Sequence, residues 1–471
     1  MVEPGHFASG WAAGFSNEIS GLRVALARLE NPKVIWLNNR AMKATIDSTA
    51  DASNKSEIEE KLINACAYFI DFAGNSEIYG WADRYGGSGI GSNGGSGRSV
   101  ILNGYSVKGI GPTPLIGVDA QSSHSSGGAF LEEAIREAIF SEFLEKFAPH
   151  GASPILAIID TAIDYEWVFG PKDSKKERRV LIVRPFELRP AHFQRAYHYR
   201  PATFEEKRAD VARVKHNFVT CSDVIGVDGL RAAFENCYMK WAEQLVFAAV
   251  HNVALGSSPS NVTLDGKILD FGAVSTLPQL ANFYVSPGTS VIDELGTMIR
   301  SLKDLANSAT EFDPVAFRDF KKDAVEKVTA SYENQLIFEI LTVVGAPETF
   351  ESVSKSDLAR NSILDGFYSY YQYATRLRLD LLSSRYPISF QTGHGVEHIW
   401  SIDRSAHLDA LRTAILGFVG GPNGRLMSTH WPITREVLRE EITAYVRAPR
   451  SDIDIDSAIA LFSARLSPDV S

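Results

Sequence analysis

The chain has 471 residues, more than one ordinary hydrophobic core organises, so we expect two or three folding units or two closely joined lobes. It is 45% hydrophobic and 22% charged, and its 47 basic and 57 acidic residues give a net charge of −10. This acidic balance argues against broad binding to nucleic acid or anionic membranes. The sequence shows neither a signal peptide nor an apolar run of about 18 residues, so we expect a cytoplasmic protein that does not enter membranes. Cys66, Cys221 and Cys237 are too scattered for a disulfide framework and predict buried thiols.

The N-terminal part of the chain predicts a mixture of strands and helices. Residues 29–39 (LENPKVIWLNN) predict a strand with a turn, and residues 55–69 predict an amphipathic helix. Residues 85–99 (YGGSGIGSNGGSGRS) form a glycine cluster, and residues 100–109 (VILNGYSVKG) predict two strands joined by a turn. A Ser/Gly-rich stretch at 118–128 predicts a flexible connection to the next element.

The later elements become helical towards the C-terminus. Residues 129–147 place apolar side chains at helical spacing and predict a helix. Residues 153–189 predict two strands, SPILAIIDTAI and RRVLIVRPFELR, separated by the charged turn PKDSKKE. Residues 228–255 predict a helix, residues 268–275 predict a strand followed by a turn, and the chain from about residue 290 is mostly helical. This order predicts an α+β protein in which a small β-rich lobe lies over a larger helical lobe.

The glycine cluster and the residues that follow it predict a phosphate site. Glycines let backbone N–H groups approach a phosphate because no Cβ intervenes, and Gly95 and Gly97 precede Arg98. Lys108, in the strand that follows, can reach phosphates as a point charge, and Glu137 on the predicted helix can hold that lysine. A glycine loop, a strand lysine and a helix glutamate in this order are typical of protein kinases.

Asn261 and Asp270 predict a metal site. Asp270 opens an Asp-Phe-Gly and follows Asn261 by nine residues. In kinase-like folds these two residue types supply hard oxygen ligands to the metal on the nucleotide phosphates. The segment between them, VTLDGKIL, predicts a hairpin with a tight Asp-Gly turn. Together the motifs predict a protein-kinase-like two-lobed fold that binds ATP and Mg²⁺ or Mn²⁺.

Several motifs, in the same order, are similar to those of the selenoprotein-O (SelO) family of protein adenylyltransferases, which have a kinase-like fold. GGSGRS resembles the family's Gly-Asp-Gly-Arg-Ala, VKGIGPTP resembles Leu-Lys-Gly-Ala-Gly-Pro-Thr-Pro, and AIREAIFSE resembles Ser-Ile-Arg-Glu-Phe-Leu-Cys-Ser-Glu. LRPAHFQRA resembles the family's Ile-Arg-Val-Gly-Thr-Phe-Gln segment, and SPSNVTLDGKILDFG has the spacing of its metal loop. The resemblance spans roughly residues 30–345.

The resemblance implies a role for each matching residue. In this family ATP is thought to bind in an orientation flipped relative to kinases, so attack falls on the α-phosphate and AMP is transferred. Lys108 would bind phosphate and pair with Glu137. The implied nucleotide-binding residues are Gly95, Gly97, Arg98, Lys108, Gly127, Arg184 and Arg189; the implied catalytic residues are Lys108, Glu137 and Asp270; the implied ligands of Mg²⁺ or Mn²⁺ are Asn261 and Asp270.

The chain departs from the family at positions that bear on the chemistry. The family has an Asp immediately before the metal-binding Asn, read as the general base, and this chain has Ser260 there. The family's Asp-Gly-Arg-Ala is Ser-Gly-Gly-Ala here, at residues 126–129, so a carboxylate and an arginine are missing. Asp119 and Asp265 are candidate replacements for the missing base.

Three functions are compatible with these motifs. The first is an enzyme, a SelO-like nucleotidyltransferase that moves AMP from ATP to a protein, peptide or small molecule (AMPylation). The second activates a carboxylate as an acyl-adenylate, or phosphorylates a small molecule, in peptide or natural-product modification; a carboxylate needs no base because it is already ionised at neutral pH. The third is a pseudokinase-like pseudoenzyme that binds nucleotide, or only keeps the fold, and works as a partner-binding module.

These motifs divide the chain into three expected regions. A β-rich nucleotide-binding lobe is expected over residues 1–190, and a helical lobe with the metal-binding loop over residues 191–380. A helical C-terminal extension is expected over residues 381–471, where TREVLREEITAYV and DSAIALFSARL have helical patterns. The extension lies beyond the resemblance, so a docking surface for a substrate or partner protein is an expectation there.

Overall fold

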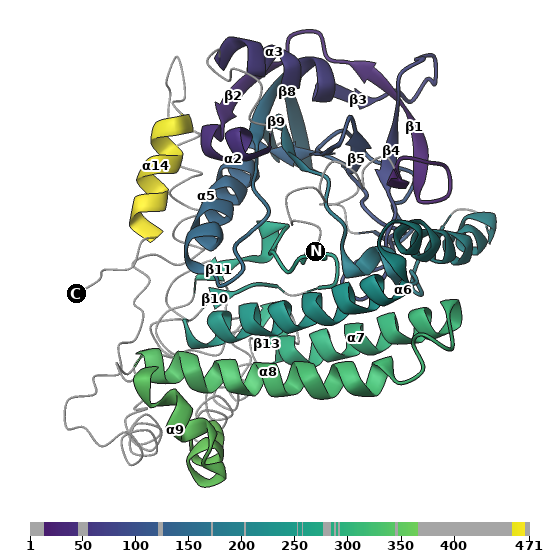
Figure 1. Ribbon diagram of the computed structural model, residues 1–471. Coiled ribbons are helices and arrows are strands. Elements are labelled where there is room, and N and C mark those ends of the chain that lie inside the picture. The colour runs from purple at the N-terminus through teal and green to yellow at the C-terminus, as the bar shows by residue number, and fades with distance from the viewer. Residues whose placement is uncertain are drawn as a thin grey trace.

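The computed structural model of the chain describes residues 14–45, 55–120, 126–170, 173–201, 204–251, 253–256, 258–276, 284–286, 289–290, 293–343, 347–365 and 455–466. Within these ranges it is a mixed α+β structure, with a curled antiparallel sheet on one side and a stack of long helices on the other (Figure 1). The predicted α+β class and the helical C-terminal region are therefore confirmed.

The main sheet contains nine strands in the order β2–β8–β9–β6–β5–β4–β1–β3, with β7 paired to β9. Side chains that alternate along its central strands enter two different cores. Ile158 and Ile182 face the larger core, which the sheet shares with the helices, whereas Ile159 and Leu181 face a smaller core that includes residues of helix α3 (Lys55–Cys66). The strands are β1 Gly21–Arg28, β2 Lys33–Leu37, β3 Tyr68–Ile70, β4 Tyr79–Asp83, β5 Ser99–Leu102, β6 Tyr105–Lys108, β7 Ala129–Phe130, β8 Ala157–Gly170 and β9 Asp173–Pro185.

The strands expected before residue 110 are confirmed, and one hairpin among them sets the position of Lys108. β5 and β6 pair antiparallel from Leu102↔Tyr105 to Ser99↔Lys108. Their two-residue turn has φ of 51° at Asn103 and 85° at Gly104, the left-handed conformations that a tight hairpin requires. The expected helix at residues 55–69 is α3, Lys55–Cys66, preceded by the short helix α2, Asn39–Thr45; the last expected helical residues belong to β3 instead.

The charged turn predicted at PKDSKKE is wrong for residues 173–177, which belong to β9. The β8–β9 hairpin extends because opposite charges lie across the ladder, as at Glu166↔Lys176. Trp167 Nε1 donates a 2.6 Å hydrogen bond to Glu177 Oε2, and the Trp167 ring also packs against Phe130. A run of charged residues can therefore form a strand when aromatic side chains or opposite charges face it across the ladder.

Helix α5, Leu131–Phe147, confirms the helix predicted at residues 129–147 except for its first two residues, which form β7. The helix lies between the sheet and the helical part of the molecule, and Ala134, Ile135 and Ala138 are fully buried in the larger core. Such burial on several sides fixes the helix, and so fixes the glutamates that it carries.

The helix predicted at residues 228–255 is the second half of a longer one, α6, Phe204–Val250. Gly226, with φ 75° and ψ 161°, breaks α6 into two segments. Phe218 and Phe234, on either side of this break, pack against each other in one core. The prediction also runs too far at its end, because Val253–Ala254 forms strand β10, which pairs with β11, Ser275–Thr276.

The chain between β10 and β11 contains the predicted hairpin. Val262 and Ile268 form an antiparallel bridge, Thr263 N donates to Lys267 O at 2.9 Å, and Gly266 turns with φ 92°. Residues 268–275 were predicted as a strand followed by a turn; the turn is confirmed at Phe271–Ala273, but the extended pairing before it stops at Ile268. Asp270 takes a left-handed conformation there, which ends extended pairing and leads into the 3₁₀ turn η3, Phe271–Ala273.

A short segment after β9 joins the sheet to the helices. The 3₁₀ turn η2, Pro190–Phe193, receives a hydrogen bond from Gly86 N at Ala191 O (2.8 Å). On its other side, Arg213 of α6 donates to His192 O at 2.7 Å and to Gln194 O at 2.6 Å. The Arg213 side chain is fully buried, so these bonds form in the interior.

The predicted helical content after residue 290 is confirmed in the part of the chain described there. The helical elements are α7 Asp293–Phe312, α8 Phe320–Val343, η4 Pro347–Thr349, α9 Phe350–Ser354 and α14 Ile455–Leu466. Two short strands, β12 Tyr284–Ser286 and β13 Thr289–Ser290, precede them. The predicted helix at TREVLREEITAYV and most of the expected extension from residue 381 lie outside the described residues. Helix α14 packs against α5 and β2. The helices in the described ranges include none with both the length and the apolarity to cross a bilayer.

Candidate functional site

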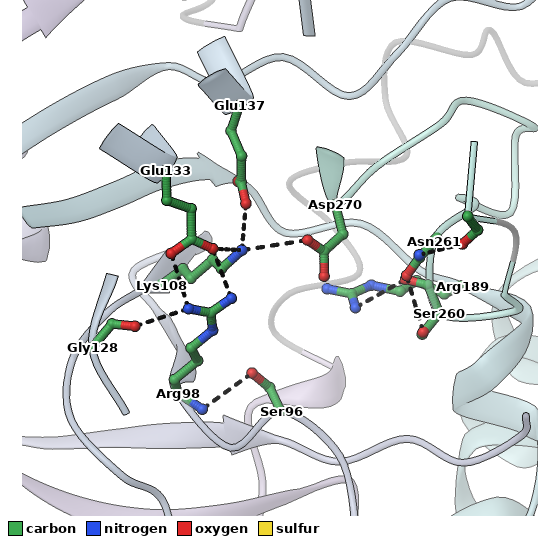
Figure 2. A network of polar contacts seen from close by, with 11 residues as sticks. Ser96, Arg98, Lys108, Gly128, Glu133, Glu137, Arg189, Ser260, Asn261 and Asp270 are labelled. Atoms are coloured by element: carbon green, nitrogen blue, oxygen red, sulfur yellow. Dashed lines mark hydrogen bonds and ion pairs between the residues drawn. The ribbon is translucent and has the colours of Figure 1, made fainter. Parts of the chain in front are cut away.

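Lys108 lies at the end of β6, where its ammonium meets three carboxylates. Its Nζ atom is 2.5 Å from Glu137 Oε1, 3.0 Å from Glu133 Oε1 and 3.3 Å from Asp270 Oδ1. The two glutamates come from successive turns of α5, and Asp270 comes from the loop before η3 (Figure 2). Burial and Arg98 lower the pKa of Lys108, but the three carboxylates outweigh them and raise it, so the lysine stays charged. The structure therefore brings the predicted lysine, helix glutamate and Asp-Phe-Gly aspartate together.

Arg98 lies beside Lys108 and is held by Glu133. Its Nη2 atom is 2.7 Å from Glu133 Oε1, its Nη1 atom is 3.1 Å from Glu133 Oε2, and Nη1 also donates to Gly128 O at 2.9 Å. Glu133 was not expected in the site from the sequence, because an acidic residue in the first turn of a helix is common for the helix dipole alone. The carboxylate nevertheless joins two of the predicted phosphate-binding cations.

Asp270 is an ionised carboxylate that reaches solvent. Its side chain is 37% exposed, although the surrounding site is closely packed. Burial alone would raise the pKa of Asp270, but Lys108, Arg184 and the other nearby arginines hold it well below its usual range. Its backbone has φ 62° and ψ 82°, a left-handed conformation that Asp tolerates better than most residues with a Cβ. A strained, ionised and accessible carboxylate is suited to bind a cation.

Arg184 and Arg189, the two arginines expected near a nucleotide, are both buried close to Asp270. Arg184 lies opposite Ser106 in the β6–β9 ladder, and within the described part of the chain its buried Nη1 has no hydrogen-bond partner. Arg189 Nη1 donates to Ser260 O at 3.2 Å, so it joins the end of the sheet to the loop that carries Asn261. Both arginines lower the pKa of the Asp270 carboxyl.

Asp83 and His192 position Arg189, and the sequence did not point to either. Asp83 Oδ2 lies 3.3 Å from Arg189 Nη2, and Asp83 Oδ1 accepts a 2.9 Å hydrogen bond from His192 Nε2. His192 Nδ1 accepts the backbone N–H of Arg189 at 3.0 Å, so the proton of a neutral ring must be on Nε2. Burial lowers the pKa of His192 despite the nearby Asp83, which keeps the ring neutral. No local sequence pattern could indicate this pair, because Asp83 and His192 are 109 residues apart.

Asn261 and Ser260 lie on the loop before the hairpin, and both are tied to their own loop. Asn261 Nδ2 donates to Gly256 O at 3.0 Å, and its Oδ1 accepts from Ser260 Oγ at 3.1 Å. Leu269 N donates to Asn261 O at 3.0 Å, which links this loop to the segment entering Asp270. Ser260 Oγ also lies 2.8 Å from Ser258 Oγ. The position that would hold a base therefore carries a buried hydroxyl in a serine network.

The predicted phosphate-contacting glycines are in close contact with the protein itself. A Cβ on Gly95, where φ is 147°, would lie 2.2 Å from Asp83 O, and one on Gly97 would lie 2.7 Å from the Ile116 side chain. A Cβ on Gly127, where φ is 63°, would lie 1.9 Å from Pro112 N. Glycine is thus required at these positions for packing of the loops, whatever the loops bind.

Lys108, Glu133, Glu137 and Asp270 form what we call the Lys108 cluster. Asp119 and Asp265, the two candidate replacements for the base, form their ion pairs with other residues. Asp119 is half exposed and forms an ion pair with Arg200. Asp265 lies at the turn of the hairpin, 3.5 Å from Lys267 Nζ. The described ranges also contain no group of three or more His, Cys, Asp or Glu side chains arranged to hold a metal ion. The three cysteines are buried free thiols, as predicted.

Glu187, two residues before Arg189, carries a carboxyl group that burial keeps protonated near neutral pH. Burial and Asp265 raise the pKa of Glu187 to about 7 from an ordinary 4.5, against the opposing effect of Lys267. The unfolded chain releases this proton at lower pH than the folded chain does. The folded state therefore loses stability as pH rises from about 4.5 to 7, and the loss is complete above pH 7.

Glu187→Gln is expected to stabilise the protein at pH 8 by up to about 3 kcal/mol and to have little effect at pH 5. The amide keeps the shape of the side chain and has no proton to lose in this range. The free energy of unfolding in urea, measured from pH 5 to 8, checks this, with exposed Glu205→Gln as the control. Parallel curves for wild type and Glu187→Gln would contradict the assignment.

Comparison with protein-family models and with curated protein sequences finds no match to this chain.

Proposed function

We propose that the chain is a kinase-like, ATP- and divalent-metal-dependent nucleotidyltransferase that moves AMP to a protein, peptide or small-molecule acceptor. The observation that carries the proposal is the Lys108 cluster. A strand lysine lies 2.5 Å from a helix glutamate and 3.3 Å from the aspartate of an Asp-Phe-Gly. This constellation suits the binding of nucleotide phosphates, and the resemblance of its motifs to the SelO family favours AMP over phosphate as the transferred group.

The charges around the cluster fit a polyphosphate and a metal. Lys108, Arg98, Arg184 and Arg189 all act on the Asp270 carboxyl, so four cations lie within electrostatic reach of one point. The ionised Asp270 and the Oδ1 atom of Asn261 would hold Mg²⁺ or Mn²⁺, which would neutralise charge on the phosphates. The orphaned Nη1 of buried Arg184 is a donor for an anion in the same place. The protein's own groups would bind and orient the nucleotide.

Formation of an acyl-adenylate is the second candidate, and Ser260 favours it. The Ser260 hydroxyl is buried and bonded to Ser258 and Asn261, so it is not a base for an alcohol acceptor at neutral pH. A carboxylate acceptor is already ionised and needs no proton removed. General-base assistance typically contributes about 10²–10⁴-fold, so a hydroxyl acceptor would react slowly here.

The first test uses ATP labelled at either the α- or the γ-phosphate, incubated with the purified protein and Mg²⁺ or Mn²⁺. We expect label from the α-position to become acid-stable on an acceptor, or to appear in an acyl-adenylate when an organic acid is added. Pyrophosphate is expected to be released in equal amount. Both signals should disappear with EDTA.

Two outcomes would reject this function. Transfer from the γ-position would mean a phosphotransferase. ATP binding without transfer or pyrophosphate release, across metals, organic acids and protein acceptors, would instead support a pseudoenzyme that binds partners, for example through its C-terminal helices.

A further inference from the structure

Two of the cations expected to bind phosphate already hold a carboxylate in this structure. Glu133 Oε1 lies 2.7 Å from Arg98 Nη2 and 3.0 Å from Lys108 Nζ, and Glu133 Oε2 lies 3.1 Å from Arg98 Nη1 (Figure 2). A carboxylate bound by both arms of a guanidinium occupies the place that a phosphate takes on an arginine. Burial raises the pKa of Glu133, but Arg98 and Lys108 outweigh it and hold the pKa well below its usual range, so the group is a permanent anion.

Neither cation depends on Glu133 for its position. Lys108 Nζ lies 2.5 Å from Glu137, whose side chain is 0% exposed, and 3.3 Å from Asp270, so two carboxylates hold its ammonium without Glu133. Arg98 donates independently to the backbone oxygen of Gly128 at 2.9 Å. Glu133 itself is 16% exposed and lies in the first turn of α5, where its side chain has solvent on one side. Its contacts therefore compensate charge more than they fix geometry.

The charges of the site are balanced when Glu133 is in place. The cations Arg98, Lys108, Arg184 and Arg189 are matched by the carboxylates Asp83, Glu133, Glu137 and Asp270. A polyphosphate that entered this arrangement would meet Arg98 and Lys108 already occupied by Glu133, whereas the Nη1 atom of Arg184 has no partner among the described residues. If Glu133 turned away, Arg98 would lose its carboxylate and become available to the incoming anion.

We propose that Glu133 is an internal anion that competes with nucleotide phosphates for Arg98 and Lys108 and so limits the affinity of the site. The identity of the ligand rests on the proposed function, whereas the competition itself concerns any phosphate anion. Binding of nucleotide then requires displacement of the Glu133 carboxylate, and the site binds phosphate weakly until that happens. Glu133 is a residue that sets affinity and does not itself take part in transfer.

The test compares wild type with Glu133→Gln and with Glu132→Gln by calorimetric titration with two probes, ATP and inorganic tripolyphosphate, each with Mg²⁺. Glu133→Gln keeps the length of the side chain and removes its charge. Glu132→Gln makes the same change in the same helical turn and controls for helix and net-charge effects. We expect Glu133→Gln to bind both probes about tenfold or more tightly than wild type, and Glu132→Gln to bind them as wild type does. Thermal unfolding of the three proteins shows that each is folded.

The outcomes separate this inference from the proposed function. Equal or weaker binding by folded Glu133→Gln, when wild type binds ATP, overturns the inference and leaves the nucleotide site standing. Tighter binding of tripolyphosphate without any binding of ATP supports the inference and rejects the nucleotide. Absence of binding of either probe to all three proteins rejects both.

Discussion

Alanine at position 270 is expected to lower the rate of nucleotide-dependent transfer by about 10²–10³-fold or more. The Asp270 carboxylate is 37% exposed, lies 3.3 Å from Lys108 and is kept ionised by the cations around it. Its removal takes away the anion proposed to hold the metal against the phosphates. It also leaves the cations of the site with one carboxylate fewer, so ATP is expected to bind without being turned over. Initial rates with α-labelled ATP and a direct binding measurement check both parts.

The matched control is Asp270→Asn. Alanine in the left-handed conformation of residue 270 costs about 1 kcal/mol, whereas asparagine tolerates that conformation. Alanine is therefore expected to lower the melting temperature slightly and asparagine is not, while both lose the carboxylate and both lose activity. An Asp270→Asn protein that transfers AMP at the wild-type rate would show that the carboxylate is not required.

Lys108→Met is expected to lower the free energy of unfolding by about 3–5 kcal/mol as well as to abolish transfer. The lysine is 4% exposed and its principal partner, Glu137, is 0% exposed. Removal of the ammonium leaves a buried carboxyl that must either keep an uncompensated charge or take up a proton. Urea unfolding and initial rates measure the two effects.

The double variant Lys108→Met with Glu137→Leu separates stability from function. It replaces the buried pair with apolar side chains of similar size, so no fully buried charge is left without its partner; Glu133 keeps Arg98, and the Asp270 side chain is 37% exposed. We expect the double variant to recover most of the lost stability and none of the activity. Wild-type stability in the single variant would mean that the pair contributes little to the fold, and recovered activity in the double variant would remove Lys108 from the proposed mechanism.

Local patterns predicted the parts of the site that depend on local geometry. Asn103-Gly104 predicted the hairpin that ends at Lys108, and Asp265-Gly266 predicted the hairpin between Asn261 and Asp270. In each case the turn needs a left-handed residue, and few residue types supply one. The helix that carries Glu137 followed from apolar spacing alone.

What the sequence missed depends on contacts between distant segments. The Asp83–His192 hydrogen bond spans 109 residues, and no periodic pattern records it. Glu133 was overlooked because an acid in a first helical turn has an ordinary explanation, and only the position of Arg98 reveals another role. The half of α6 before Gly226 was not predicted, although its apolar residues pack in the same core as those of the predicted half.

The joint around η2 has a consequence for how the protein unfolds. The segment from residue 190 to 194 is hydrogen-bonded to the glycine loop through Gly86 and to α6 through Arg213. His192, within this segment, also accepts the backbone N–H of Arg189. Neither half of the chain can loosen without breaking hydrogen bonds that the other half also uses. We therefore expect the sheet, the helices and the geometry around Lys108 to be lost together when the protein unfolds.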